Sequence, residues 1–162
     1  LPFRQRRPSG PPGRGDAERD RAGLRNAAGA MRARFPGLCL LGGHSYGGRM
    51  ASLLVSEDAP VADALVLFSY PLHPPGRTEW LRTEHFPRLR LPVLFVQGSR
   101  DPFGTVEELE AALGLVAGRK ELMVIEGGGH DLGRGGKLRN AVDRAAAVLA
   151  RWFPPPEAAP GA

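Results

Sequence analysis

Three residues, Ser45, Asp101 and His130, have the side chains that nucleophilic catalysis by a serine requires. A serine hydroxyl is a weak nucleophile, so it needs a base, and a histidine base needs a carboxylate to orient it. Each of the three follows a short apolar run, and groups that follow parallel strands gather at one edge of a sheet. We therefore predict that Ser45 attacks an ester-like carbonyl to form an acyl-enzyme, with His130 as base and Asp101 orienting it. The backbone N–H of Tyr46 would supply one oxyanion donor.

The serine lies at the centre of a Gly-His-Ser-Tyr-Gly sequence, residues 43–47, which fits the G-x-S-x-G pattern of a sharp turn between a strand and a helix. The apolar run 38–41 precedes it, and a predicted helix over 49–56 follows it. Glycines at both ends of the pattern let the strand and the helix approach each other closely. The pattern alone is weak, and the flanking elements are what favour a nucleophile over an ordinary turn serine.

The carboxylate partner of His130 has three candidates. Asp101 lies in a turn sequence after an apolar run, and because Thr105 is predicted to cap the next helix, Asp101 is not needed for capping. Glu126 and Asp131 lie beside His130 in the sequence and are the alternatives. We favour Asp101 and assign Asp131 to support of the loop. For His130 itself, the only histidine after the last predicted strand, the alternative is a surface position in that loop.

Further polar residues could line a substrate pocket near these three. We expect His44, next to the serine, and Tyr70 and His73, in a proline-rich loop, to do so. For His44 the alternative is a packing role. His85 could also line the pocket, and for His73 and His85 a solvent-exposed position is an equally good interpretation. The sequence has no cysteine and histidine cluster with zinc-ligand spacing, so we expect neither a metal nor a cofactor.

Apolar runs that alternate with helical patterns must position these residues. Strands are predicted at 38–41, 64–68, 93–96 and 122–125, and helices at 16–35, 49–56, 78–85, 105–116 and 138–152. This alternation predicts an α/β fold with a parallel sheet flanked by helices. One domain is expected over 16–153, between a flexible, Pro/Gly/Arg-rich arm at 1–15 and a disordered tail at 154–162.

The net charge is +5 over 162 residues, but its distribution argues against nucleic acid as a partner. Nine arginines fall within residues 1–35 and the remainder is close to neutral, so no folded basic face is indicated. No apolar stretch reaches membrane-spanning length and the first residues do not resemble a signal peptide, so we expect no membrane partner. A single cysteine, Cys39, fits a reducing compartment. We expect a cytoplasmic protein that acts on a small molecule; the oligomeric state is left open.

The candidate residues occur in the order Ser, Asp, His, and with their flanking segments they resemble the α/β-hydrolase superfamily. The resemblance is carried by residues 42–52, 95–104 and 129–132, with further similarity at 70–76 and 81–85. It is most specific to a small dienelactone-hydrolase-like branch of predicted hydrolases. That branch includes a testis-expressed hydrolase-like protein and a subunit of a chromatin acetyltransferase complex. The resemblance extends to about Phe153 and implies an esterase-like hydrolase without a cofactor.

Two features of the chain depart from this family. Enzymes named for dienelactone hydrolysis use a cysteine nucleophile, whereas this turn carries Ser45, so their substrate is not implied. The family fold also begins with several strands and an oxyanion loop, and the four predicted strands correspond to its C-terminal half. We therefore expect an N-terminally truncated hydrolase that lacks the second oxyanion donor, a loss of roughly 10²–10³ in rate. A non-catalytic interaction module, as the chromatin-complex relative suggests, and an acyltransferase are the alternatives.

Overall fold

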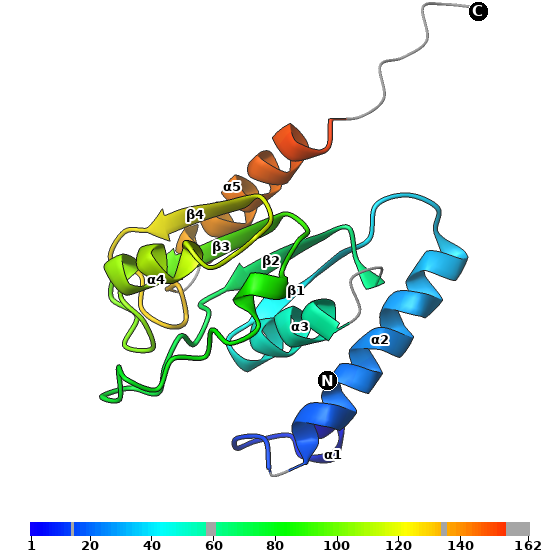
Figure 1. Cartoon of the computed structure of the whole chain (residues 1–162), viewed down its shortest axis with the longest axis horizontal. Coiled ribbons are helices and arrows are strands. Elements are labelled where there is room, and N and C mark those ends of the chain that lie inside the picture. Colours follow the sequence, from blue (N-terminus) through cyan, green and yellow to red (C-terminus); the bar gives the residue numbers. More distant parts are fainter. Residues whose placement is uncertain (14, 58–60, 134–135, 155–162) are drawn as a thin grey trace, which may run out of the picture.

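Four parallel strands form one sheet in the computed structural model, which describes residues 1–13, 15–57, 61–133 and 136–154. The strands, in the spatial order β1-β2-β3-β4, are β1 (Leu40–His44), β2 (Ala64–Phe68), β3 (Val93–Gly98) and β4 (Lys120–Ile125) (Figure 1). Their register pairs His44 with Phe68, Phe68 with Val96, and Gly98 with Ile125. The carboxyl ends of β1, β3 and β4 therefore meet at one edge of the sheet. The predicted fold class is confirmed.

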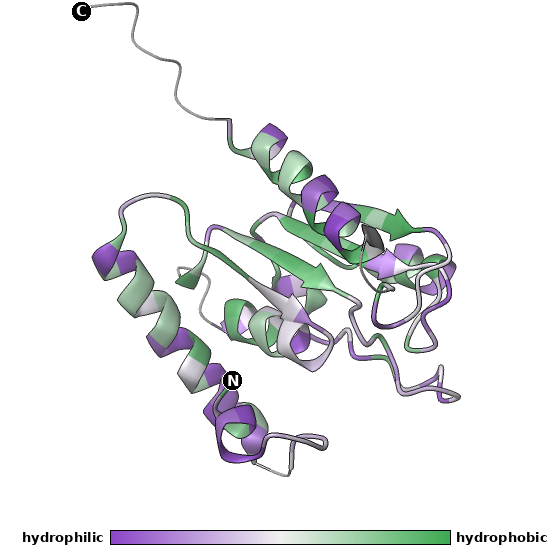
Figure 2. Ribbon diagram, turned by 180° about the vertical axis from the view of Figure 1, so that it is seen from behind, coloured by the Kyte–Doolittle hydropathy of each residue, from purple (hydrophilic) through white to green (hydrophobic). Residues whose placement is uncertain are grey.

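Helices cover the two faces of the sheet (Figures 1 and 2). On one face, residues of α2 (Asp16–Arg34), α3 (Tyr46–Glu57) and α4 (Val106–Leu113) share a core with Leu65, Leu67 and Phe95. On the other face, α5 (Gly136–Trp152) packs against Val66, Leu94 and Val96. Successive residues of a strand point to opposite faces, and both faces are covered, so β2 and the first four residues of β3 are apolar without a break. This explains why their sequences show no polar alternation.

The start of α4 forms as its sequence predicts. The Thr105 hydroxyl accepts a hydrogen bond from the Glu108 N–H at 3.2 Å, and the Glu108 carboxylate accepts one from the Thr105 N–H at 2.9 Å. This reciprocal capping box satisfies N–H groups that a helix otherwise leaves without partners. The helix ends at Leu113, earlier than the sequence predicts.

The first residues are not loop throughout, although the sequence predicts a loop or flexible arm over 1–15. A short helix, α1 (Pro2–Arg6), packs on α2. The Phe3 side chain is buried in an edge-to-face contact with Tyr46, and the Phe3 N–H donates to the Asp20 carboxylate at 2.9 Å. One apolar side chain and one buried acceptor therefore order a segment whose composition favours a loop. Residues 155–162 of the expected tail lie outside the described residues.

The helix predicted at 78–85 is wrong: this segment forms turns, and a short 3₁₀ helix, η2 (Phe86–Arg88), follows it. The Arg82 N–H donates to the Leu72 carbonyl at 2.8 Å instead of bonding within a helix. The Tyr70 hydroxyl donates to the Arg82 carbonyl at 2.7 Å. These cross-loop bonds occupy the backbone groups that a helix would use.

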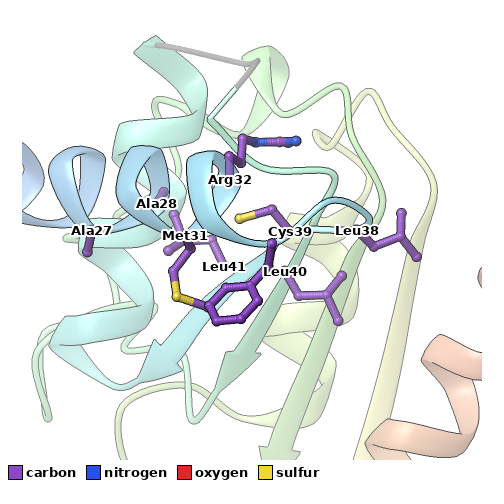
Figure 3. Close-up of a pocket in the computed structure, with 9 residues that line it drawn as sticks. Ala27, Ala28, Met31, Arg32, Leu38, Cys39, Leu40 and Leu41 are labelled. Atoms are coloured by element: carbon purple, nitrogen blue, oxygen red, sulfur yellow. The ribbon is translucent and has the colours of Figure 1, made fainter.

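An apolar hollow of about 210 Å³ lies between the end of α2 and the start of β1 (Figure 3). Met31, Phe35, Leu38 and Leu40 line it and are each roughly half exposed. Among the described strands β1 pairs with β2 alone, so its outer edge is open. The hollow is at the opposite end of β1 from Ser45. In the described part of the chain, no helix has both the length and the apolar character needed to cross a bilayer.

Candidate active site

Ser45 lies in a sharp turn between β1 and α3, with a backbone φ of 53°. This left-handed conformation is uncommon for a residue other than glycine and is held by the surrounding contacts. The Ser45 N–H donates to the Phe68 carbonyl at 2.8 Å, which extends the pairing of β1 with β2 into the turn. A Cβ at Gly48 would lie 2.7 Å from the Gly43 carbonyl oxygen, and one at Gly43 would lie 2.9 Å from the backbone of Gly47. Strand and helix are therefore in backbone contact, as the glycine spacing predicts.

The three predicted residues come together at this turn. The Ser45 Oγ lies 2.7 Å from the His130 Nε2, and the His130 Nδ1 lies 2.9 and 3.0 Å from the two oxygens of Asp101. A carboxylate can only accept, so the Nδ1 of His130 carries the proton. The Nε2 is then free to accept the hydrogen of the Ser45 hydroxyl. The result is a continuous hydrogen-bonded chain from carboxylate to imidazole to hydroxyl.

Asp101 is buried and held from two further sides. The Gln97 side-chain amide donates to one oxygen at 3.0 Å and also to the Gly104 carbonyl at 3.2 Å. The Phe103 N–H donates to the other oxygen at 2.9 Å. The Phe103 ring also packs on the His130 imidazole, with centroids 4.2 Å apart and planes 31° apart. Sequence reasoning missed both residues, although a glutamine at the end of the otherwise apolar strand β3 is the signal that could have identified Gln97.

The two alternative carboxylates lie near His130 without bonding to it. Glu126 is exposed, and the Asp131 carboxylate accepts from the Gly133 N–H at 3.0 Å, so it supports its own loop. Asp101, which follows the neighbouring strand β3, is the carboxylate that bonds His130 among the described residues. The carboxylate that bonds His130 is thus the one that is distant in sequence, and not either of the two that are close to it in the chain.

Tyr46 is tied to the N-terminal helices through Asp20. The Tyr46 hydroxyl donates to the Asp20 carboxylate at 2.9 Å, and Asp20 is fully buried. Burial and the bond to Asp20 raise the pKa of Tyr46 well above its usual range. Tyr46 is also the first residue of α3, and the first N–H groups of a helix have no partner within it. Sequence reasoning did not identify Asp20.

A hollow of about 410 Å³ opens beside Ser45, and the rings of His44 and Tyr46 contribute to its lining. His44 therefore lines a hollow beside Ser45. Tyr70 and His73, which we also expect in a substrate pocket, are not among the residues that line this hollow. Tyr70 is fully buried in the core, where burial raises its pKa, and the buried His73 bonds the Pro74 carbonyl at 2.9 Å and a Glu108 oxygen at 3.1 Å.

His85 is also buried away from this hollow. Its Nε2 lies 2.8 Å from the Ser52 Oγ, and the Ser52 hydroxyl donates to the Arg49 carbonyl at 2.9 Å. Burial, with the charges of Arg49 and Arg88, lowers the pKa of His85 to about 4. The imidazole is therefore neutral near pH 7 and donates to Ser52. Across the described ranges, no group of three or more His, Cys, Asp or Glu side chains is arranged to hold a metal ion.

The fold has counterparts among known proteins. Residues 13–153 match the family model of the alpha/beta hydrolase domain. The chain therefore belongs to the alpha/beta hydrolase family, and the superfamily resemblance is confirmed.

Solved structures with this fold include three named hydrolases. A predicted CIB-like hydrolase from Thermoplasma acidophilum has a TM-score of 0.64 at 18% identity, over 86% of this chain and 62% of that one. The esterase Est2 from Thermogutta terrifontis has a TM-score of 0.58 at 20% identity, over 86% and 65%. The dienelactone hydrolase from Anabaena variabilis has a TM-score of 0.52 at 23% identity, over 70% and 47%. The present chain thus spans less than two thirds of each, and the likeness is one of fold.

Proposed function

We propose that this chain carries the nucleophile, base and acid of a serine hydrolase that cleaves ester-like bonds in small molecules. The observation that carries the proposal is the hydrogen-bonded chain from Asp101 through His130 to Ser45, with the serine at the tip of a glycine-flanked turn. Family membership supports the same reaction class. The hollow beside Ser45 supports a substrate of small-molecule size.

The proposed reaction starts with transfer of the Ser45 hydroxyl proton to the Nε2 of His130 as the Oγ attacks the substrate carbonyl carbon. The tetrahedral oxyanion accepts a hydrogen bond from the Tyr46 N–H at the start of α3, where the helix dipole also favours negative charge. The Nε2 then gives its proton to the leaving alcohol oxygen as the carbon–oxygen bond breaks. Asp101 stabilises the positively charged imidazole and holds its Nδ1–H. Water, activated by His130, releases the acid from the acyl-enzyme.

Removal of the nucleophile tests this proposal directly. Ser45→Ala is expected to abolish labelling by a fluorophosphonate probe and hydrolysis of p-nitrophenyl acetate. Ser56→Ala is the matched control, because Ser56 lies on α3, the helix that follows Ser45, and its hydroxyl donates to the Leu53 carbonyl at 2.7 Å. Equal signals from wild type and Ser45→Ala would contradict the proposal. A folded wild type without any labelling would also contradict it and favour an interaction module.

Replacement of the carboxylate tests the role of Asp101. Asp101→Asn keeps the shape of the side chain but presents an amide, so the His130 Nδ1–H loses an ionised acceptor and the imidazole can adopt the wrong tautomer. We expect kcat to fall by up to about 10⁴-fold. Thermal melting of the variant checks that it is folded. A folded Asp101→Asn protein within tenfold of wild type would show that another group orients His130.

A further inference from the structure

We propose that His44 is a positioning residue that holds the His130 loop against the nucleophile turn; this rests on the proposed function. His44 ends β1, directly before Ser45, and its Nε2 lies 2.6 Å from the His130 carbonyl oxygen. A carbonyl only accepts, so the His44 Nε2 carries a proton and donates it. The two imidazole rings lie 5.1 Å apart and inclined at 56°. The contact joins the two segments whose separation sets the distance from nucleophile to base.

The topology explains why such a contact is needed. Ser45 follows β1 and His130 follows β4, and these are the two outer strands of the described sheet. Neighbouring strands are about 4.8 Å apart, so the His130 loop must reach across three spacings, roughly 14 Å. After Glu126 the loop has three glycines, Gly127–Gly129, which restrict the backbone little. A base at the end of such a loop needs an anchor at its far side.

The other hydrogen bonds that tie this loop to a neighbouring segment go to the residues after β3, among them the bond from the His130 Nδ1 to Asp101. Two more lie near the start of the loop. The Gly127 N–H donates to the Ser99 hydroxyl at 2.9 Å, and the Arg100 N–H donates to the Gly128 carbonyl at 2.8 Å. Both anchors belong to the segment after β3. At the far side, the described residues of the nucleophile turn make two hydrogen bonds to His130, one from Ser45 and one from His44.

Of these two bonds from the nucleophile turn, only the one from His44 persists through the proposed reaction. When Ser45 is acylated, its Oγ has no hydrogen left to donate to His130. The bond from the His44 Nε2 to the backbone of His130 involves neither reacting atom, so it remains. His44 would then hold the base in place while water attacks the acyl-enzyme. Loss of this contact is expected to lower kcat more than it changes KM.

Two substitutions distinguish the effect of the His44 hydrogen bond from the effect of its ring packing. His44→Phe keeps a ring and removes the donor, whereas His44→Gln places an amide N–H close to the position of the Nε2. Leu40→Phe is the control, since Leu40 is an exposed residue on the same face of β1, away from the turn. With p-nitrophenyl acetate we expect kcat to fall at least about tenfold in His44→Phe, with KM within about threefold. His44→Gln and Leu40→Phe should remain within about threefold of wild type. A His44→Gln protein as slow as His44→Phe, or a His44→Phe protein as fast as wild type, would overturn the proposal.

A second measurement does not depend on hydrolysis. The Nδ1 proton of His130, held by Asp101, should give a downfield proton NMR signal that sharpens when the loop is fixed. We expect this signal in wild type and in His44→Gln, and its broadening or loss in His44→Phe. If the three proteins give these signals but wild type hydrolyses no ester, the positioning role of His44 is supported and the proposed function is contradicted. An unchanged signal in a folded His44→Phe protein would overturn the role of His44 alone.

Discussion

Replacing Gly48 by alanine would place a methyl group where helix α3 contacts strand β1. The added Cβ would lie 2.7 Å from the Gly43 carbonyl oxygen, whereas ordinary contacts to a Cβ begin at 3.4 Å. Strand and helix would have to separate by about 0.7 Å, and overpacking of this kind costs about 1–3 kcal/mol. The turn that carries Ser45 lies between the two elements and would move with them. We expect Gly48→Ala to lower both the stability of the protein and the reactivity of the serine.

Gly29→Ala is the control for this substitution. Gly29 lies in α2, and a Cβ there would meet nothing within 4 Å. Both variants gain the helix propensity of alanine, about 1 kcal/mol, so their difference isolates the backbone contact at Gly48. For a chain of this size, a difference of about 1–3 kcal/mol corresponds to about 2–12 °C in Tm.

Thermal melting and the rate of fluorophosphonate labelling measure the two effects. We expect Gly29→Ala to melt at or above the wild-type temperature and to label normally. Gly48→Ala should melt lower and label up to about 10²-fold more slowly, because displacements approaching 1 Å misplace the nucleophile. Equal melting temperatures and equal labelling rates for the two variants would refute the reasoning, since they would mean that the contact between Gly43 and Gly48 does not restrict the turn.

Two further predictions concern buried polar groups. Tyr46→Phe keeps the ring but removes a donor to the buried Asp20, and we expect about 1–3 kcal/mol lower stability in urea unfolding; an unchanged midpoint would contradict this. The pKa of His85 is lowered from 6.5 to about 4, so between these values the unfolded chain binds a proton that the folded protein does not. Stability from this group is fully present above about pH 6.5 and is lost as the pH falls to about 4, by roughly 2–3 kcal/mol. His85→Gln does not titrate and can still donate to Ser52, so its stability should decline less over this range; parallel pH curves for the two proteins would contradict the prediction.

The strands could be predicted from the sequence because each core strand is buried on both faces. The continuous apolar run at 64–68 coincides with β2, and the run at 93–96 lies within β3. The bounds of the strand before Ser45 are predicted less well: the sequence predicts 38–41, whereas β1 begins at Leu40 and continues to His44. Its pairing with β2 through Gly42 and Gly43 sets these limits, and backbone pairing leaves no hydrophobic signal at a glycine.

Elements that depend on distant partners were mispredicted for a physical reason. The segment 78–85 has a helical pattern, yet its Arg82 N–H bonds to Leu72 and not within the segment. The short helix α1 forms in a segment of loop-like composition because Phe3 finds a buried site beside Tyr46. In each case a tertiary contact outweighs the local preference of the sequence.

By itself, the sequence determined the chemical types and the order of the candidate site: a serine in a glycine-flanked turn, then an aspartate, then a histidine, each after an apolar strand. Only the tertiary structure decided that His130 crosses from β4 to Ser45 beside β1, that Asp101 and not Asp131 holds the imidazole, and that Gln97 and His44 support the arrangement. The reason is that local signals come from neighbours in the chain. The strand order and register bring together side chains from loops up to 86 positions apart, and no local pattern encodes those distances.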